Sequence, residues 1–162
     1  MTFRRFEDIR AWQAAREVVR LVYAASKGRK FGHDFGLRDQ LRRAAVSIMA
    51  NIAEGFAHRS DKEFARFLFG AKGSSAEVQS HLYVAHDQGY VNGDEFKVLY
   101  AKTESCSKQL AGLISFLLGR TGTARAMDTK TADPVDTGRR RLKGAGADSV
   151  DSVDSEDSAD VL

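Results

Sequence analysis

The side chains most able to do chemistry in this sequence are its four histidines, its single cysteine and its glutamates. A di-metal site in a helix bundle needs the spacing Glu-x-x-His, which places two ligands on one helical face. No glutamate here is followed by histidine at the third position. The metal-binding spacings His-Glu-x-x-His and Cys-x-x-Cys are absent as well. The sequence therefore predicts no metal site and no cofactor.

Acid–base or nucleophilic catalysis has equally little support. His81 and His86 are five residues apart, so they diverge on a helix. Glu54 and His58 are four apart, but His58 follows a predicted helix end, which favours a surface ion pair over a catalytic couple. Cys106 lies in an apolar helical pattern typical of an inert core thiol. We expect a protein that is not an enzyme.

Polar residues with helical spacing form one candidate site. Ser47, Asn51 and Glu54 follow steps of four and three, and Ser74 and Glu77 repeat the pattern on a later segment. One interpretation is a hydrogen-bonded seam that fixes the register of two helices. The other is a polar surface used between subunits or for a ligand.

Basic residues form a second candidate site, in two groups. Arg38, Arg42 and Arg43 lie in one predicted helix, and Arg59, Lys62 and Arg66 lie at the hairpin turn that follows it. Arginine suits phosphate because its planar fork bonds two oxygens. The plainer interpretation is solvated helix faces with acidic partners such as Asp39 and Asp61. The aromatic residues follow the apolar pattern, so none is expected to stack on nucleic-acid bases.

Four long segments with helical periodicity position these residues. We predict helices near residues 8–27, 36–55, 61–88 and 93–118, with Trp12, Leu41, Phe67 and Leu110 buried. Asp8 is the predicted cap of the first helix, and the second helix is predicted to start near Asp34. The capping boxes Ser60–Glu63 and Asn92–Glu95 are the predicted starts of the third and fourth helices. Gly28 is the predicted left-handed end of the first helix. The apolar stripe of that helix is read as Ile9, Trp12, Val19, Val22 and Tyr23.

These segments predict an all-α fold, an antiparallel up-down-up-down four-helix bundle, because short connectors force neighbouring helices to alternate in direction. Residues that face each other on the second and third helices should have numbers summing to roughly 116. That register places Gly70 and Gly73 against Ala44, Ala45 and Ser47, where small residues let the backbones approach. It also places Glu77 near Gln40 and Arg43.

Composition divides the chain into a bundle, residues 1–119, and a tail, residues 120–162. The bundle holds 18 Lys and Arg against 13 Asp and Glu, whereas the tail holds 7 against 9 and no aromatic residue. We expect a disordered tail, basic and then acidic, because it has too few large apolar residues to order itself. It is either merely solvated or an electrostatic clamp that competes for the basic bundle.

The sequence gives no sign of membrane insertion or secretion. No run approaches the roughly 20 apolar residues of a membrane span, and no secretory signal is recognisable at the N-terminus. A single cysteine suits a reducing compartment. We therefore expect no membrane partner and a cytoplasmic location.

Two motifs resemble a known family. The run from Phe35 to Ile48, which contains Leu41-Arg42-Arg43-Ala44, is followed by Asn51-Ile52-Ala53-Glu54-Gly55. Together they resemble the four-helix-bundle proteins encoded by intervening sequences of bacterial 23S rRNA genes. Further matches are Trp12-Gln13, Gly73-Ser74 with Glu77, and Gly89-Tyr90, so the resemblance covers about residues 3–119. Departures are Gly32, where members often carry proline, and the tail.

The resemblance implies a bacterial source and a ring-shaped homo-oligomer, a pentamer. It also implies kinship with the accessory protein of diversity-generating retroelements, which binds nucleic acid and a reverse transcriptase. Two functions stay open. The first is a non-enzymatic homo-oligomeric scaffold that binds RNA or DNA through basic residues. The second is an assembly or adaptor module that acts only on protein partners.

Overall fold

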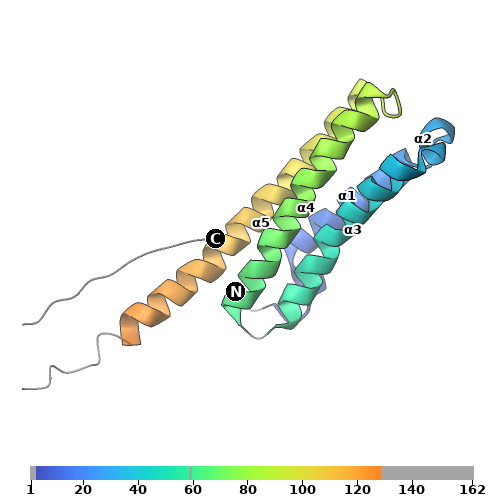
Figure 1. Ribbon diagram of the computed structural model, residues 1–162. Coiled ribbons are helices and arrows are strands. Elements are labelled where there is room, and N and C mark those ends of the chain that lie inside the picture. The colour runs from blue at the N-terminus through green and yellow to red at the C-terminus, as the bar shows by residue number, and fades with distance from the viewer. Residues whose placement is uncertain (1–2, 59, 129–162) are drawn as a thin grey trace, which may run out of the picture. The chain divides into compact units, whose positions relative to one another are not determined.

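The computed structural model describes residues 3–58 and 60–128, and these ranges contain helices and no strand. A 3-10 turn, η1 (Phe6–Asp8), precedes α1 (Arg10–Ala25), and the short helix α2 (Arg29–His33) follows it. The remaining helices are α3 (Phe35–Ala57), α4 (Asp61–Asp87) and α5 (Gly93–Asp128). The four long helices lie alongside one another, and α2 lies at the N-terminal end of α3 (Figure 1).

Each long helix packs against two neighbours. Helix α1 contacts α3 and α5, and α4 contacts the same two helices from the other side. Consecutive long helices are therefore antiparallel neighbours, and α5 closes the bundle against α1. The predicted all-α up-down-up-down bundle is confirmed.

Side-chain caps fix the starts of the last three long helices. Asp34 Oδ1 accepts a hydrogen bond from Leu37 N at 3.0 Å, and Ser60 Oγ accepts one from Glu63 N at 3.5 Å. The third cap is reciprocal. Asn92 Oδ1 accepts from Glu95 N at 2.9 Å, while Asn92 N donates to Glu95 Oε2 at 2.9 Å. The caps at Ser60 and Asn92 were predicted, because a capping box depends only on residues within one turn. The second helix was predicted to start near Asp34, but the capping role of its carboxylate was not predicted.

The first helix begins and ends differently from the prediction. Asp8 belongs to η1, where its carboxylate accepts from Arg5 N at 3.2 Å, and α1 begins at Arg10 without a side-chain cap. Gly28 has a φ of −54°, so it is not left-handed, and the connector after it forms α2. Among the described glycines, Gly89 has the positive φ, 68°, at the end of α4.

The last helix is longer than predicted. Helix α5 continues to Asp128, nine residues beyond Gly119, where the bundle was predicted to end. At 1.5 Å per residue this adds about 13 Å to the helix. The rest of the predicted disordered tail, residues 129–162, lies outside the described residues.

The core runs the length of the bundle. Its largest fully buried side chains include Leu41, Ile48, Leu68, Leu82 and Leu110. Leu41 and Leu110 were predicted to be buried, whereas Trp12 and Phe67 are only half-buried. Trp12 packs at the edge with its ring against Phe6, 5.1 Å between centroids.

The buried face of α1 is rotated from the predicted one. Ala11, Ala15, Val18 and Val22 are buried, while Tyr23 is exposed. Two of the four buried positions of α1 are the small residues Ala11 and Ala15. Larger residues at the rim created the misleading pattern, because a periodicity analysis gives alanine little weight beside tryptophan or tyrosine.

Candidate functional site

The basic residues at the start of α3 are partly occupied in holding the fold. Arg38 donates to the carbonyl of Gly32 at 3.0 Å and pairs with Asp39 at 2.7 Å. Arg42 donates to both oxygens of Ser26, at 2.7 Å to Oγ and 3.1 Å to the carbonyl. Ser26 is the C-cap of α1, so a guanidinium here also complements the negative end of that helix. Arg42 is therefore a tie between α1 and α3.

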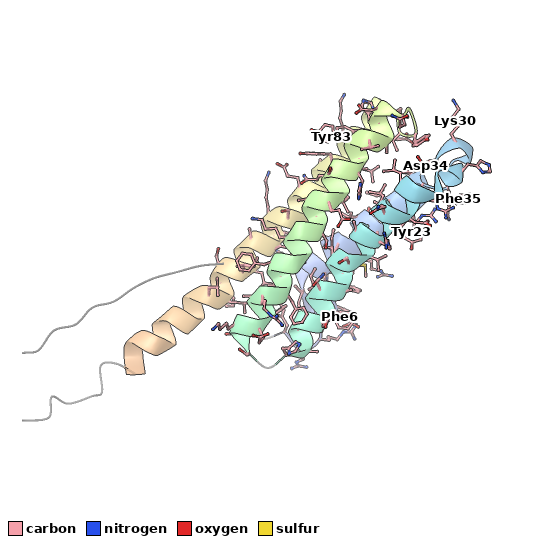
Figure 2. The ribbon with its side chains drawn as sticks, viewed as in Figure 1. Phe6, Tyr23, Lys30, Asp34, Phe35 and Tyr83 are labelled. Atoms are coloured by element: carbon pink, nitrogen blue, oxygen red, sulfur yellow. The ribbon has the colours of Figure 1, made fainter. Side chains whose placement is uncertain are left out.

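Arg43 differs from these two neighbours. It is exposed, and in the part of the chain that the structure describes its side chain makes no ion pair. It borders a surface hollow of about 650 Å³ on the α1–α3 side, together with Tyr23, Val46 and Ala50. Figure 2 shows Tyr23 on this side of the bundle. In the first basic group, Arg43 is the cation available to a ligand.

The second basic group lies at the other end of α3. Lys62 is exposed and has no ion pair within the described residues, while Arg66 pairs with Glu63 at 3.1 Å. Arg59 lies outside the described residues. Arg43 and Ala57 are separated by 14 residues of α3, or about 21 Å. The two predicted groups are therefore separate surfaces.

Three of the five predicted seam residues come together between α3 and α4. Ser74 Oγ donates to Ser47 Oγ at 3.0 Å, and Asn51 Nδ2 donates to the Ser47 carbonyl at 2.8 Å. Gly70 lies opposite, where an added Cβ would stand 2.9 Å from Asn51 Oδ1. This arrangement matches the interpretation as a seam that fixes register.

The other two seam residues lie apart. Glu54 is exposed, and Glu77 pairs with His81 at 3.4 Å rather than with Arg43 as the predicted register placed it. The observed contacts Ser47–Ser74 and Asn51–Gly70 both sum to 121, five more than predicted. Helix α3 runs two residues past Gly55, which accounts for two of these five positions. Gly73 has open space around it, so its predicted packing role is wrong.

The single thiol is enclosed by the core. Cys106 is fully buried, and its Sγ donates to the carbonyl of Ala11 at 3.6 Å. Burial raises the pKa of the Cys106 thiol to about 12, because the charged thiolate loses its solvation. A thiol in this position is a packing residue.

Several surface features have no counterpart in the sequence predictions. Tyr83, Phe96 and Tyr100 form an aromatic cluster between α4 and α5, with ring centroids 5.0 to 5.7 Å apart. A hydrogen bond with Tyr83 raises the pKa of Tyr100. Phe69 stands exposed on the outer face of α4. Phe96 and Tyr100 were read as part of the apolar stripe of the fourth helix and are half-buried, whereas Tyr83 and Phe69 lie off the buried stripe of α4, a spacing that indicates an outward position.

A groove of about 740 Å³ also lies between α1 and α5. Its apolar lining includes Phe3, Ile9, Leu113 and Phe116. Gln109 lies in the same groove, and its Oε1 is buried and has no hydrogen-bond partner among the residues that the structure describes. This surface therefore offers apolar contact area together with one unused acceptor.

Residues 3–58 and 60–128 contain no group of three His, Cys, Asp or Glu side chains placed to hold a metal ion. No helix within them is long and apolar enough to cross a membrane.

Comparison with known proteins gives the family. The chain matches the family of the 23S rRNA-intervening sequence protein over residues 7–112. It is similar to the crystal structure of a protein of unknown function from the S23 ribosomal protein family of Bacteroides thetaiotaomicron. The TM-score is 0.59 at 22% identity, and the match covers 64% of this chain and 97% of the other, which shows a shared fold. No functionally curated protein matches the sequence. With two thirds of its length inside the family match, this chain belongs to the 23S rRNA-intervening sequence protein family.

Proposed function

We propose that this chain is a non-enzymatic, homo-oligomeric scaffold that binds RNA or DNA through exposed basic residues in the cytoplasm. The proposal rests on two exposed cations that are not neutralised by an ion pair. Arg43 on α3 and Lys62 on α4 are exposed and make no ion pair in residues 3–58 and 60–128. Arg66 adds a third cation beside Lys62, held by an exposed pair with Glu63. Unpaired surface cations are free to neutralise phosphates.

The expected binding is electrostatic and reads little sequence. Helix α3 and helix α4 supply charge but no base-reading module, so phosphate contacts dominate. Log affinity should fall linearly with log salt, with a slope of about 0.9 per phosphate neutralised on duplex DNA and about 0.7 on single strands. Fluorescence anisotropy with labelled oligonucleotides of unrelated sequences measures this slope. Binding that ignores salt between low and physiological concentration contradicts the proposal.

A variant series locates the contacts. Arg43→Ala, Lys62→Ala and Arg66→Ala should weaken binding to every sequence alike and reduce the salt slope. Arg38 and Arg42 are less informative, because their replacement also removes the contacts to Gly32 and Ser26. Lys97→Ala is the matched control, since this exposed lysine already pairs with Asp94 at 3.6 Å. If Lys97→Ala loses as much affinity as the other variants, the net charge of the protein governs binding and the individual positions do not.

Homo-oligomerisation is the second part of the proposal. A ring closes when two different patches of one subunit fit each other around a rotation axis. The apolar groove between α1 and α5 supports the proposal as one such patch. Light scattering at micromolar concentration should return a multiple of 17.8 kDa, five-fold for a pentamer. A monomer mass contradicts it.

The groove also favours the alternative, an adaptor that binds only proteins. Apolar lining with few charges is typical of the centre of a protein interface. Crosslinking in cells, followed by recovery and sequencing of bound nucleic acid, separates the two functions. Recovered RNA or DNA supports the first, and protein adducts without nucleic acid support the adaptor.

A further inference from the structure

Phe69 is a large aromatic side chain in an unexpected place. It lies in the N-terminal half of α4, where Phe64 and Leu68 are buried, yet 55% of its surface is exposed. Within the described ranges its ring contacts no other aromatic ring. The exposed face of α4 continues at steps of three and four through Lys62, Arg66, Phe69 and Gly73. The ring is therefore on the outer face of the helix.

Cations surround this ring. Arg66 and Lys72 lie three residues before and after Phe69, and Lys62 lies seven residues before it on the same face. Lys62 and Lys72 make no ion pair among the residues described. Arg66 pairs with Glu63, and its guanidinium lies 5.3 Å from the centre of the Phe67 ring. Both partners of the ion pair are exposed, so the pair contributes little and opens readily. From Lys62 to Lys72 the cations span ten residues of helix, about 15 Å.

The surface beside the ring is open. An added Cβ on Gly73, one turn further along the same face, would have nothing within 4 Å. Gly70 is also exposed. A flat group can therefore approach the Phe69 ring from the side of Gly73 without meeting a side chain at that position. This differs from Phe35, also exposed, because the guanidinium of Arg38 lies 4.7 Å from the centre of that ring.

We propose that this outer face of α4 is a stacking site for single-stranded nucleic acid. An unpaired base stacks on Phe69, and the flanking phosphates lie against Lys62, Arg66 and Lys72. The inference rests on the proposed nucleic-acid function and names the strand type that this surface accepts. In a duplex the bases are stacked on one another, so the ring reaches only an unpaired base. Because every base has a π-face, the site tolerates any sequence.

Two probes of equal length test the site, a labelled 12-nucleotide oligo-uridine and a 12-base-pair RNA duplex. Phe69→Ala should weaken binding of the single strand roughly ten-fold, as expected for one lost base stack, and leave duplex binding unchanged. Phe69→Leu keeps an apolar side chain that cannot stack on a base, so it should lose as much affinity for the single strand as Phe69→Ala. Phe35→Ala, the matched exposed phenylalanine, should leave both affinities unchanged. The triple variant of Lys62, Arg66 and Lys72 to Ala should weaken both probes.

A spectroscopic readout reports the stack directly. Phe69→Trp in a Trp12→Phe background places the only tryptophan of the chain at the site. The oligo-uridine should quench its fluorescence, whereas the duplex should not. Circular dichroism melting of each variant confirms that the bundle is intact, and exposure of Phe69 predicts that it is.

The outcomes separate the two proposals. Salt-dependent binding that Phe69→Ala leaves intact on both probes overturns the stacking site and leaves the proposed function standing. Wild-type protein that binds neither probe at low salt overturns both. A Phe69→Ala variant with a reduced oligomer mass in light scattering shows that the ring contacts a second copy, which also overturns the stacking site.

Discussion

The hydroxyl of Tyr90 donates a hydrogen bond of 3.2 Å to Asp34 Oδ2, joining residues 56 positions apart. The other oxygen of the same carboxylate caps α3 through Leu37 N. The Tyr90 ring stacks on Phe31 of α2, with 5.0 Å between centroids. Asp34 lies at the α2–α3 junction (Figure 2). One carboxylate therefore starts a helix and ties it to the turn between α4 and α5.

Tyr90→Phe should lower the urea midpoint of unfolding, because it removes the donor and leaves the ring. Desolvation and then the Asp34 hydrogen bond raise the pKa of Tyr90 above its ordinary value. The neutral phenol is the donor, so this stabilisation is present below about pH 10 and is lost as pH rises through the raised pKa. Tyr23→Phe is the control, since the Tyr23 hydroxyl makes no hydrogen bond in the described part of the chain. If Tyr90→Phe and Tyr23→Phe unfold at the same urea concentration, the Tyr90–Asp34 hydrogen bond does not stabilise the bundle.

Arg42→Ala should destabilise the bundle by about 1–3 kcal/mol, the usual cost of leaving buried polar groups without their charged partner. Ser26 is fully buried and would lose both of its contacts to Arg42. The neighbouring Arg43→Ala should change stability by no more than about 0.5 kcal/mol, since this side chain is exposed. Urea unfolding of both variants measures the difference. A larger loss for Arg43→Ala would reverse the assignment of the structural arginine.

Gly55 and Gly73 should respond to alanine with opposite signs. A Cβ on Gly55 would lie 2.7 Å from Phe67 Cβ and 2.8 Å from Phe64 Cδ2, so α3 and α4 would have to move apart. We expect a cost of about 1–3 kcal/mol, typical of overpacking. Gly73→Ala meets nothing and should stabilise by about 0.5–1 kcal/mol through helix propensity. Thermal melts that shift in the same direction would contradict this prediction.

The features that could be predicted from the sequence are those set by neighbours along the chain. The caps at Ser60 and Asn92 each depend on residues within one turn, and both are present. The buried stripes of α3, α4 and α5 follow from large apolar residues repeated with the helical period. Antiparallel order then follows from the short connectors.

The features that could not be predicted depend on how one helix is rotated and shifted against another. Ala11 and Ala15 line the core because of the face that α1 turns toward α3 and α5, and no local pattern encodes that rotation. The position of Arg42 in the helical pattern is typical of a surface cation. Its hydrogen bond to Ser26, which joins α1 and α3, depends on how the two helices pack. Phe69 fits neither the predicted core nor a predicted site, because its significance depends on which face of α4 is left open.

Cys106 should be unreactive toward Ellman's reagent in the native protein and should react only as the chain unfolds. The reagent needs a thiolate and access to it, while the buried thiol has its pKa raised to about 12. The neutral thiol is the form that the fold favours. Its contribution is therefore complete below about pH 8.5, the pKa of a free cysteine, and is lost as pH rises toward 12. The free energy of unfolding of the wild type, measured relative to that of Cys106→Ala, should therefore fall between these two pH values. The comparison isolates the thiol, because lysine and tyrosine residues titrate in both proteins. Labelling at neutral pH as fast as free cysteine would contradict the core assignment, and labelling that tracks the unfolded fraction in urea would confirm it.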